Sequence, residues 1–131
     1  MALKKIGFFR ELQHGDKTGK SLKVAMHNHS LENENEVVKY LNSGIVFCVT
    51  AGLAFDVLDE SAGVIGSLEI LTDGTWAWPS DLLYYVKKYH VELDTSFIEY
   101  AKEHEWTMPS KDKIDLLNLE FWVLGAENGL Y

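Results

Sequence analysis

The chain has 131 residues, of which 47% are hydrophobic and 24% charged, so it is long enough to bury a core and too apolar for a disordered protein. Its single cysteine, Cys48, excludes an internal disulfide, and no run of about 20 apolar residues predicts a membrane span. The start MALKKIGFF lacks the long apolar stretch of a secretion signal. We therefore expect one domain over residues 1–131, located in the cytoplasm, with no cofactor.

The formal net charge of −8 is unevenly distributed. Residues 1–24 contain six basic and two acidic side chains, a net charge of +4, so residues 25–131 have a net charge of −12. An acidic body disfavours nucleic acid as a partner and suits a basic protein, and without an apolar run no membrane partner is expected. The alternative is an ordinary acidic surface that keeps a small protein soluble.

Residues 14–20, HGDKTGK, predict a turn-rich loop. The loop runs into Gly-Lys-Ser, but its glycine spacing does not fit a phosphate-binding loop. Residues 21–29 fit a helix or a strand. In a strand, His27 and His29 share one face and could offer two metal ligands, but no third ligand can be assigned, so hydrogen-bonded histidines and no metal are expected.

The next helix is predicted to begin at Asn33, with Glu36 three residues later in a capping-box pattern. Its apolar side consists of Val37, Val38, Tyr40 and Leu41, and Gly44 ends it. Three glutamates, at positions 32, 34 and 36, cluster at the helix start, where the helix dipole favours negative charge. That placement explains them without a binding role.

Residues 45–50, IVFCVT, form the plainest strand pattern in the chain. The continuous apolar run predicts a central strand covered on both faces. Cys48 within it is expected to be buried, with a raised thiol pKa, and is not expected to be a nucleophile. Ala51-Gly52 breaks the run, and residues 54–58 form a second short strand.

Acidic side chains surround the loop that follows. Asp56, Asp59 and Glu60 could form an acidic rim with Asp73 if their loops meet at one edge of the sheet. Such a rim would be one way to contact a basic partner.

A hairpin is predicted next, because Asp73-Gly74 separates a run at 67–72 from a run at 75–78. Trp76 and Trp78 share one face of the returning strand, where they form either a core wall or an aromatic platform. The core is favoured for such large aromatic side chains. A platform would instead give a binding surface made of Asp73, Trp76, Trp78, Asp81 and Tyr84.

Two helices follow the hairpin. Pro79-Ser80-Asp81 predicts a helix start at which the short polar side chains satisfy free amides. An apolar stripe at 82, 85, 86 and 89 faces the core, with Asp81, Tyr84 and Lys88 on the other side. A second helix is predicted to start at 94–96, with Phe97, Ile98 and Ala101 at helical spacing.

Three segments resemble a group of small bacterial proteins, frequent in actinomycetes, that have no assigned activity. They are KIGFFRELQHGD at 5–16, AGLAFDVLD at 51–59 and LTDGTWAWPSDLLYYVKKYHVELDTSF at 71–97. The resemblance covers most of residues 5–106 in the same order. It implies no catalytic residue.

After Pro109 the pattern is ambiguous. Residues 110–115 fit a turn or a helix start, and residues 117–124 fit a strand by alternation and a helix by spacing. An apolar tail of this kind would pack on the sheet or join a neighbouring subunit. It is the segment we expect to mediate any homodimer.

These patterns predict an α+β fold: one small sheet of four to six strands, at least partly antiparallel, with two or three helices on one face. A parallel βαβ arrangement is the alternative. The first functional hypothesis is a protein-binding module of the toxin-neutralising immunity type. The second is a small-molecule site on Trp76, Trp78, Tyr84 and Tyr85 with Asp73 or Asp81, and the third is an enzyme with an Asp/His site, although no catalytic residue can be named.

Overall fold

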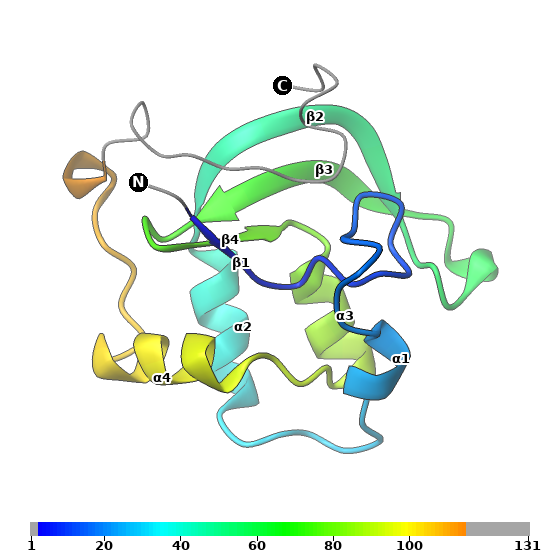
Figure 1. Ribbon diagram of the computed structural model, residues 1–131, viewed down its shortest axis with the longest axis horizontal. Helices are drawn as coiled ribbons and strands as arrows, with labels where there is room; N and C mark the ends of the chain where they lie inside the picture. The colour runs from blue at the N-terminus through cyan, green and yellow to red at the C-terminus, as the bar shows by residue number, and fades with distance from the viewer. Residues whose placement is uncertain (1–2, 115–131) are drawn as a thin grey trace.

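The computed structural model describes residues 3–114, which form a four-stranded sheet with helices on one side (Figure 1). The strand order is β1-β4-β3-β2; β1 pairs parallel to β4, and the other two pairings are antiparallel. This confirms the predicted α+β fold with its small, partly antiparallel sheet. The strands are β1 (Lys4–Lys5), β2 (Ile45–Phe55), β3 (Val64–Thr72) and β4 (Trp76–Pro79). The helices are α1 (Leu22–Ala25), α2 (Glu34–Asn42), α3 (Leu82–Tyr89) and α4 (Thr95–Glu103), with short 3-10 helices η1 (Glu60–Ala62) and η2 (Lys111–Lys113).

The main core lies between the sheet and the helices, and aromatic rings dominate it. Trp76 and Trp78 are 6% and 1% exposed, and both rings meet the ring of Phe97 edge to face, at centroid distances of 5.5 and 5.8 Å. Tyr40 of α2 packs against Trp78 at 6.1 Å. The favoured prediction that these two indoles belong to the core is confirmed. Burial of such large rings is the dominant stabilising contribution available to a small domain.

The opposite face of the sheet has a smaller apolar cluster. It consists of Leu3, Phe8, Ile70 and Ala77, with Phe47 and Cys48 packed against it. Cys48 is only partly buried, not fully buried as predicted, but desolvation still raises the pKa of its thiol, as expected. Cys48 is therefore a small packing residue whose reactive thiolate is disfavoured.

The predicted hairpin joins β3 to β4, with Thr72 opposite Ala77. Positive φ occurs at Gly74 (94°) and not at Asp73, so the tight turn sits one residue later than Asp73-Gly74. The Asp73 carboxylate instead accepts the amides of Thr75 and Trp76, at 2.9 and 2.7 Å. Asp73 is thus a buried turn residue.

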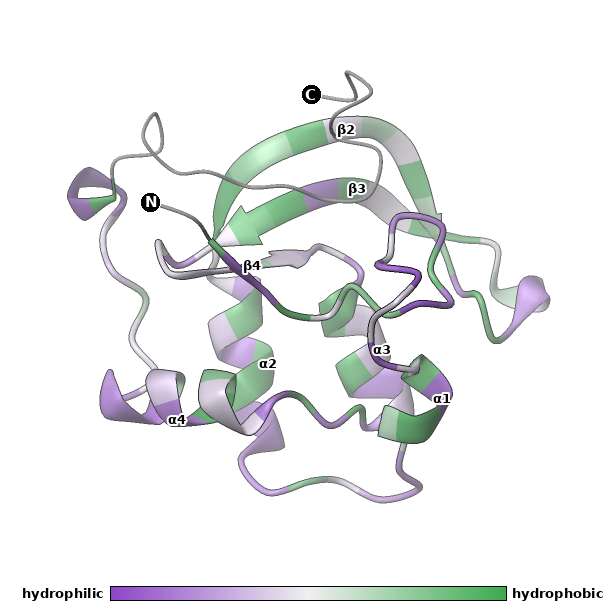
Figure 2. Ribbon diagram, in the orientation of Figure 1, coloured by the Kyte–Doolittle hydropathy of each residue, from purple (hydrophilic) through white to green (hydrophobic). Residues whose placement is uncertain are grey.

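One prediction is wrong: among the described residues β2 is an edge strand of the sheet, opposite β1, and not a central strand. Val49 and Leu53 are 64% and 53% exposed. The strand continues through Ala51-Gly52 to Phe55, and the expected break appears as a register shift between Val49 and Leu53. Figure 2 shows β2 as hydrophobic along most of its length. A continuous apolar run predicts a strand but does not identify the strand's neighbours.

Two helix starts differ from their predicted capping. Asn33 precedes α2 in the left-handed region (φ 61°) without a capping side-chain bond, and Glu34, not Glu36, reaches back to the Leu31 amide at 3.3 Å. Asp81 precedes α3 and also makes no cap. Ser80 does not cap the helix either, since its hydroxyl donates a hydrogen bond to the Ser67 carbonyl at 2.9 Å.

The segment at 21–29, left open between helix and strand, contains the single-turn helix α1. No helix within residues 3–114 is long and apolar enough to cross a membrane. The predictions for the apolar tail and for a homodimer through it concern residues 115–131, which lie outside the described residues.

Candidate functional site

A cavity of about 320 Å³ lies where the start of α2, the end of α3 and the link to α4 meet. Its floor is apolar and is supplied by three elements: Val37 of α2, Val86 of α3 and Val91 of the link are all buried. Glu32, Glu34 and Glu92 also line it, whereas neither lysine nor arginine does. We call this cavity the acidic groove. An apolar floor with a few polar groups is the usual composition of a ligand site.

The three glutamates of the acidic groove differ in their exposure and in the contacts that their carboxylates make. Glu34 Oε1 accepts from the Leu31 amide and lies 2.9 Å from His90 Nδ1. Glu92 Oε1 lies 3.3 Å from His27 Nε2, yet its side chain is 68% exposed. Glu32 is exposed and makes no hydrogen bond or ion pair with any described residue. The rim therefore includes two carboxylates that a partner can reach.

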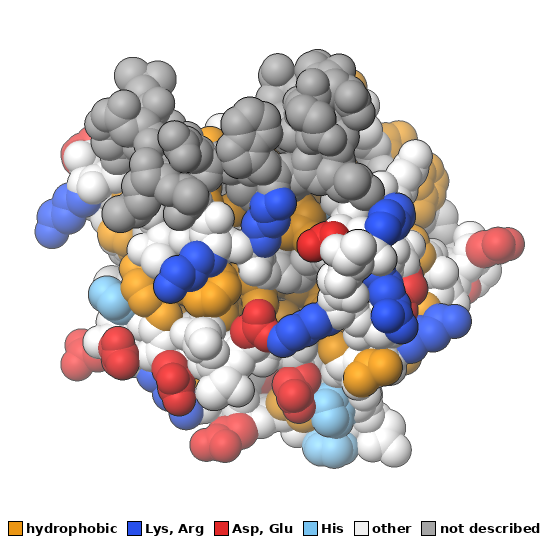
Figure 3. All heavy atoms as spheres, viewed as in Figure 1, with side chains coloured by type: hydrophobic (Ala, Val, Ile, Leu, Met, Phe, Trp, Pro, Cys, Tyr) orange, Lys and Arg blue, Asp and Glu red, His pale blue; other side chains and the backbone are white. Residues whose placement is uncertain are grey.

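Acidic side chains extend from the groove over the helical side of the molecule. In Figure 3, Asp and Glu gather along the lower half of the view, over α4 and the loop before α2, whereas Lys and Arg lie mostly above them. The exposed glutamates of this region include Glu32, Glu36, Glu92, Glu99, Glu103 and Glu105. Part of the basic N-terminal charge is neutralised internally, because Lys20 forms an ion pair with Asp94.

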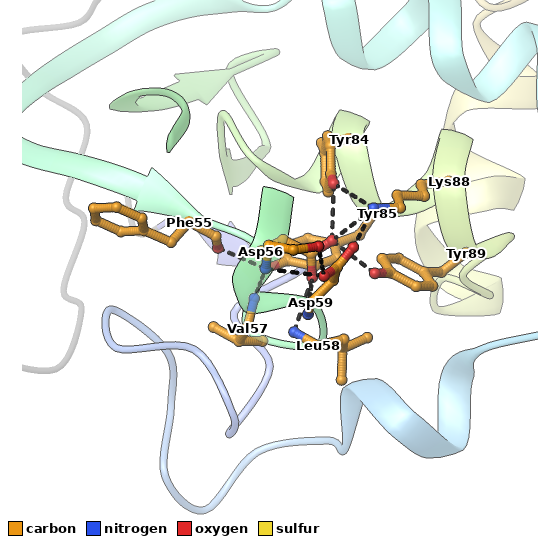
Figure 4. Close-up of polar contacts among 10 residues, drawn as sticks. Phe55, Asp56, Val57, Leu58, Asp59, Tyr84, Tyr85, Lys88 and Tyr89 are labelled. Atoms are coloured by element: carbon orange, nitrogen blue, oxygen red, sulfur yellow. Dashed lines mark hydrogen bonds and ion pairs between the residues drawn. The ribbon is translucent and has the colours of Figure 1, made fainter. Parts of the chain in front are cut away.

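A second polar cluster surrounds Asp56, which follows β2 and is 3% exposed. Figure 4 shows Tyr84, Lys88 and Tyr89 of α3 converging on this carboxylate. Their distances to Asp56 Oδ2 are 2.8, 3.2 and 2.6 Å. The amides of Leu58 and Asp59 donate to Oδ1 at 2.8 and 3.1 Å. With five donors the carboxylate has no capacity left for a substrate, so Asp56 fastens the loop after β2 to α3.

The same contacts control ionisation in this cluster. Burial alone would raise the pKa of Asp56, but hydrogen bonds from Tyr89, Tyr84, the Leu58 amide and Lys88 outweigh it and lower that pKa. Burial and the bond to Asp56 raise the pKa of Tyr89 to about 12. Hydrogen bonds to Tyr84 and Asp56 raise the pKa of Lys88. Asp56 is therefore anionic and Lys88 cationic at neutral pH.

The acidic rim proposed from sequence is not assembled as one unit. Asp56 and Asp59 do meet, because Lys88 Nζ lies 3.2 and 3.4 Å from their carboxylates. Glu60 is exposed on η1 beside them. Asp73, however, lies at the far end of β3, beyond Thr72, whereas the Asp56 loop follows Phe55, which pairs with Val64 at the start of β3. Only Asp59 and Glu60 remain as surface carboxylates here.

Among residues 3–114, one Asp/His pair is present, between His14 and Asp81. His14 Nε2 lies 3.0 Å from Asp81 Oδ2, and the two side chains are 18% and 0% exposed. The contact has an ion-pair distance without hydrogen-bond alignment, and both Asp81 oxygens otherwise have no hydrogen-bond partner. The pair joins the first and third of the segments that carry the resemblance described above, 67 residues apart. No nucleophilic side chain within residues 3–114 is hydrogen-bonded to it.

The residues predicted for an aromatic binding face are spread through the fold. Trp76 and Trp78 are in the core, Asp73 is in the hairpin turn, and Asp81 is buried beside His14. Tyr84 is half-buried in the Asp56 cluster. The structure does not bring these five side chains together as a surface.

The histidine pair proposed as metal ligands is close but incomplete. The rings of His27 and His29 meet edge to face at 5.7 Å. His27 contacts Glu92 and His29 contacts Asn28. Among residues 3–114 no group of three or more His, Cys, Asp or Glu side chains is arranged to hold a metal ion.

Comparison with known proteins does not add to this geometry: no family model, no curated protein and no solved structure matches the chain. The acidic groove was not predicted from the sequence, which attributed the glutamates at 32, 34 and 36 to the helix dipole. The available signal was Glu92, a charged residue between Val91 and Leu93 in the short link between two helices. A charged residue between two buried apolar residues indicates that its side chain is exposed to solvent next to the hydrophobic core.

Proposed function

We propose that this chain is a protein-binding module of the toxin-neutralising immunity type, which covers a basic surface of its partner with carboxylates. The observation that supports this most directly is the group of exposed glutamates on the helical side, around the acidic groove. Complementary charge speeds encounter between proteins and fixes their relative orientation. A packed core lies beneath the acidic side, which favours binding without large rearrangement.

The competing functions have less support. A small-molecule site on the hairpin would need an exposed aromatic face, and its two indoles are buried. An enzyme would need more than the His14–Asp81 pair, because an acid–base pair acts on a nucleophile or substrate within hydrogen-bond reach. We rank both below a binding module.

The test measures binding to proteins of the predicted class. The immobilised full chain is exposed to catalytic domains of secreted bacterial nucleases that carry a net positive charge, at low and at high salt, by biolayer interferometry. Binding by one or more domains that weakens steeply with salt is expected. If no domain binds at low salt, or if binding is insensitive to salt, the proposal is wrong.

A further inference from the structure

The acidic groove presents two kinds of surface to a ligand, an apolar floor and an acidic rim. Val37, Val86 and Val91 supply a buried apolar floor, so a ligand that fills the groove must have an apolar portion. Glu32 and Glu92 stand at the exposed rim, so the end of that ligand nearest solvent meets negative charge. A purely apolar ligand would make no favourable contact with the rim carboxylates. A small hydrated cation would make no apolar contact with the floor.

A lysine or arginine side chain has both parts in the required order. Its aliphatic stem packs on apolar surface while its charged end stays near water, which is how these side chains behave at protein surfaces. Both partners of the resulting ion pair stay close to solvent, which limits the desolvation cost that a fully buried pair would incur.

We propose that the acidic groove is the receptacle for one lysine or arginine side chain of a basic partner protein. This inference rests on the proposed function and specifies where the partner's anchoring residue binds. The stem lies on Val86 and Val91, and the charged end lies between Glu32 and Glu92. Anchors of this kind, seated in a pocket and surrounded by weaker contacts, contribute a large share of the affinity of protein interfaces.

The charge pattern around the groove supports a cation from outside the chain. Of the basic residues of α3 and its C-cap, His90 pairs with Glu34 of the groove lining, and Lys88 is engaged outside the groove by Asp56 and Asp59. His27 approaches Glu92 only at 3.3 Å, leaving that carboxylate mostly exposed. Glu32 has no partner among residues 3–114.

The test uses n-butylguanidinium, which reproduces an arginine stem and head. The isotopically labelled full chain is titrated with this probe, with guanidinium, which lacks the stem, and with n-butanol, which lacks the charge. Saturable NMR shifts are expected at the amides of Val91 and Leu93 with n-butylguanidinium, and weaker binding of both comparison compounds. Equal binding of n-butanol would overturn the proposal, because the groove would then be an apolar cavity without preference for a cation.

A matched pair of variants separates the groove from general attraction. Glu32→Gln/Glu92→Gln removes two exposed rim charges, and Glu60→Gln/Asp112→Asn removes two exposed charges on η1 and η2. The rim variant is expected to weaken n-butylguanidinium binding about fivefold, and the control by less than about twofold. Retained circular dichroism spectra check the fold of both variants. An equal effect of the two variants would overturn the proposal.

The same variants, tested against the nuclease domains, distinguish the two proposals. If a basic domain binds and both variants weaken it equally, the proposed function stands and the groove is not the anchor site. If no domain binds while n-butylguanidinium still occupies the groove, the proposed function is wrong, and so is the assignment of the cation to a protein. Greater weakening of domain binding by the rim variant supports both proposals.

Discussion

The Tyr40 hydroxyl donates a 2.5 Å hydrogen bond to Asp73 Oδ2, which joins α2 to the turn of the β3–β4 hairpin. Both residues are 1% exposed. Burial and the adjacent carboxylate raise the pKa of Tyr40, so the phenol is protonated and remains a donor at neutral pH. A local turn is in this way completed by a residue 33 positions earlier in the chain.

Tyr40→Phe is expected to lower the free energy of unfolding by about 1–3 kcal/mol, because it leaves one oxygen of a buried carboxylate short of a donor. Urea denaturation followed by circular dichroism measures the loss. Tyr100→Phe is the control, since its hydroxyl contacts Thr75 Oγ1 at 3.0 Å in a less buried position, and a smaller loss is expected. Equal losses would contradict the role assigned to the Tyr40 contact.

Asp56→Asn is expected to destabilise the fold by about 2 kcal/mol at pH 7, because the five donors around Asp56 then face a neutral group. The pKa of Asp56 is lowered in the folded state. Its ionisation therefore stabilises the fold above its unfolded-state pKa, about 3.9, and this contribution is lost as pH falls through the folded-state pKa. The difference between wild type and variant should shrink in acid. Urea unfolding at several pH values tests this, and a constant difference from pH 7 to pH 3 would refute it.

His14→Ala is expected to be costly, by roughly 3 kcal/mol, because it leaves the buried Asp81 carboxylate without its one partner. Adding Asp81→Asn should restore part of the loss, since an unpaired neutral amide costs less to bury than an unpaired charge. The four unfolding free energies form a double-mutant cycle. Additive losses would show that the two side chains are not coupled.

Gly44→Ala is expected to destabilise by about 1–3 kcal/mol through overpacking. A Cβ at this position would lie 2.5 Å from Trp78 Cζ2 and 3.0 Å from Leu71 Cβ. Gly52→Ala provides the control within β2, because the nearest side-chain atom, Thr50 Oγ1, would be 3.6 Å from the new Cβ. Thermal unfolding should separate the two variants by several degrees.

Acrylamide quenching of variants that retain one tryptophan each is expected to show protection at Trp76 and Trp78 and stronger quenching at Trp106, which is only partly buried. Phenylalanine replaces the other indoles to preserve packing. Strong quenching at Trp76 or Trp78 would show that this indole is exposed to solvent and would contradict its assignment to the core.

The elements that could be predicted from the sequence are those determined by local periodicity. The stripe of Leu82, Tyr85 and Val86 predicted α3, and Phe97 with Ala101 predicted α4, because helical spacing alone brings those side chains to one face. Contacts between distant segments could not be predicted. Asp81 has the sequence position of a helix cap, and only the tertiary structure shows that it lies beside His14.

The candidate site was missed for a related reason. Each glutamate of the acidic groove has an adequate local explanation, and the groove exists only because α2, α3 and the link to α4 meet. The edge position of β2 was missed because Val46 and Val49 have the composition of a central strand. Composition reports how apolar a strand is, and strand order depends on connections elsewhere in the chain.

The two layers of the acidic groove differ in how freely they can change during evolution. Its floor residues, Val37, Val86 and Val91, also belong to the main core, so replacing them would cost stability. Glu32 and Glu92 at the rim are exposed, and substitutions there leave packing intact. A lineage could therefore alter the charge pattern that its partner meets, one rim position at a time, while the fold that presents the pattern is preserved.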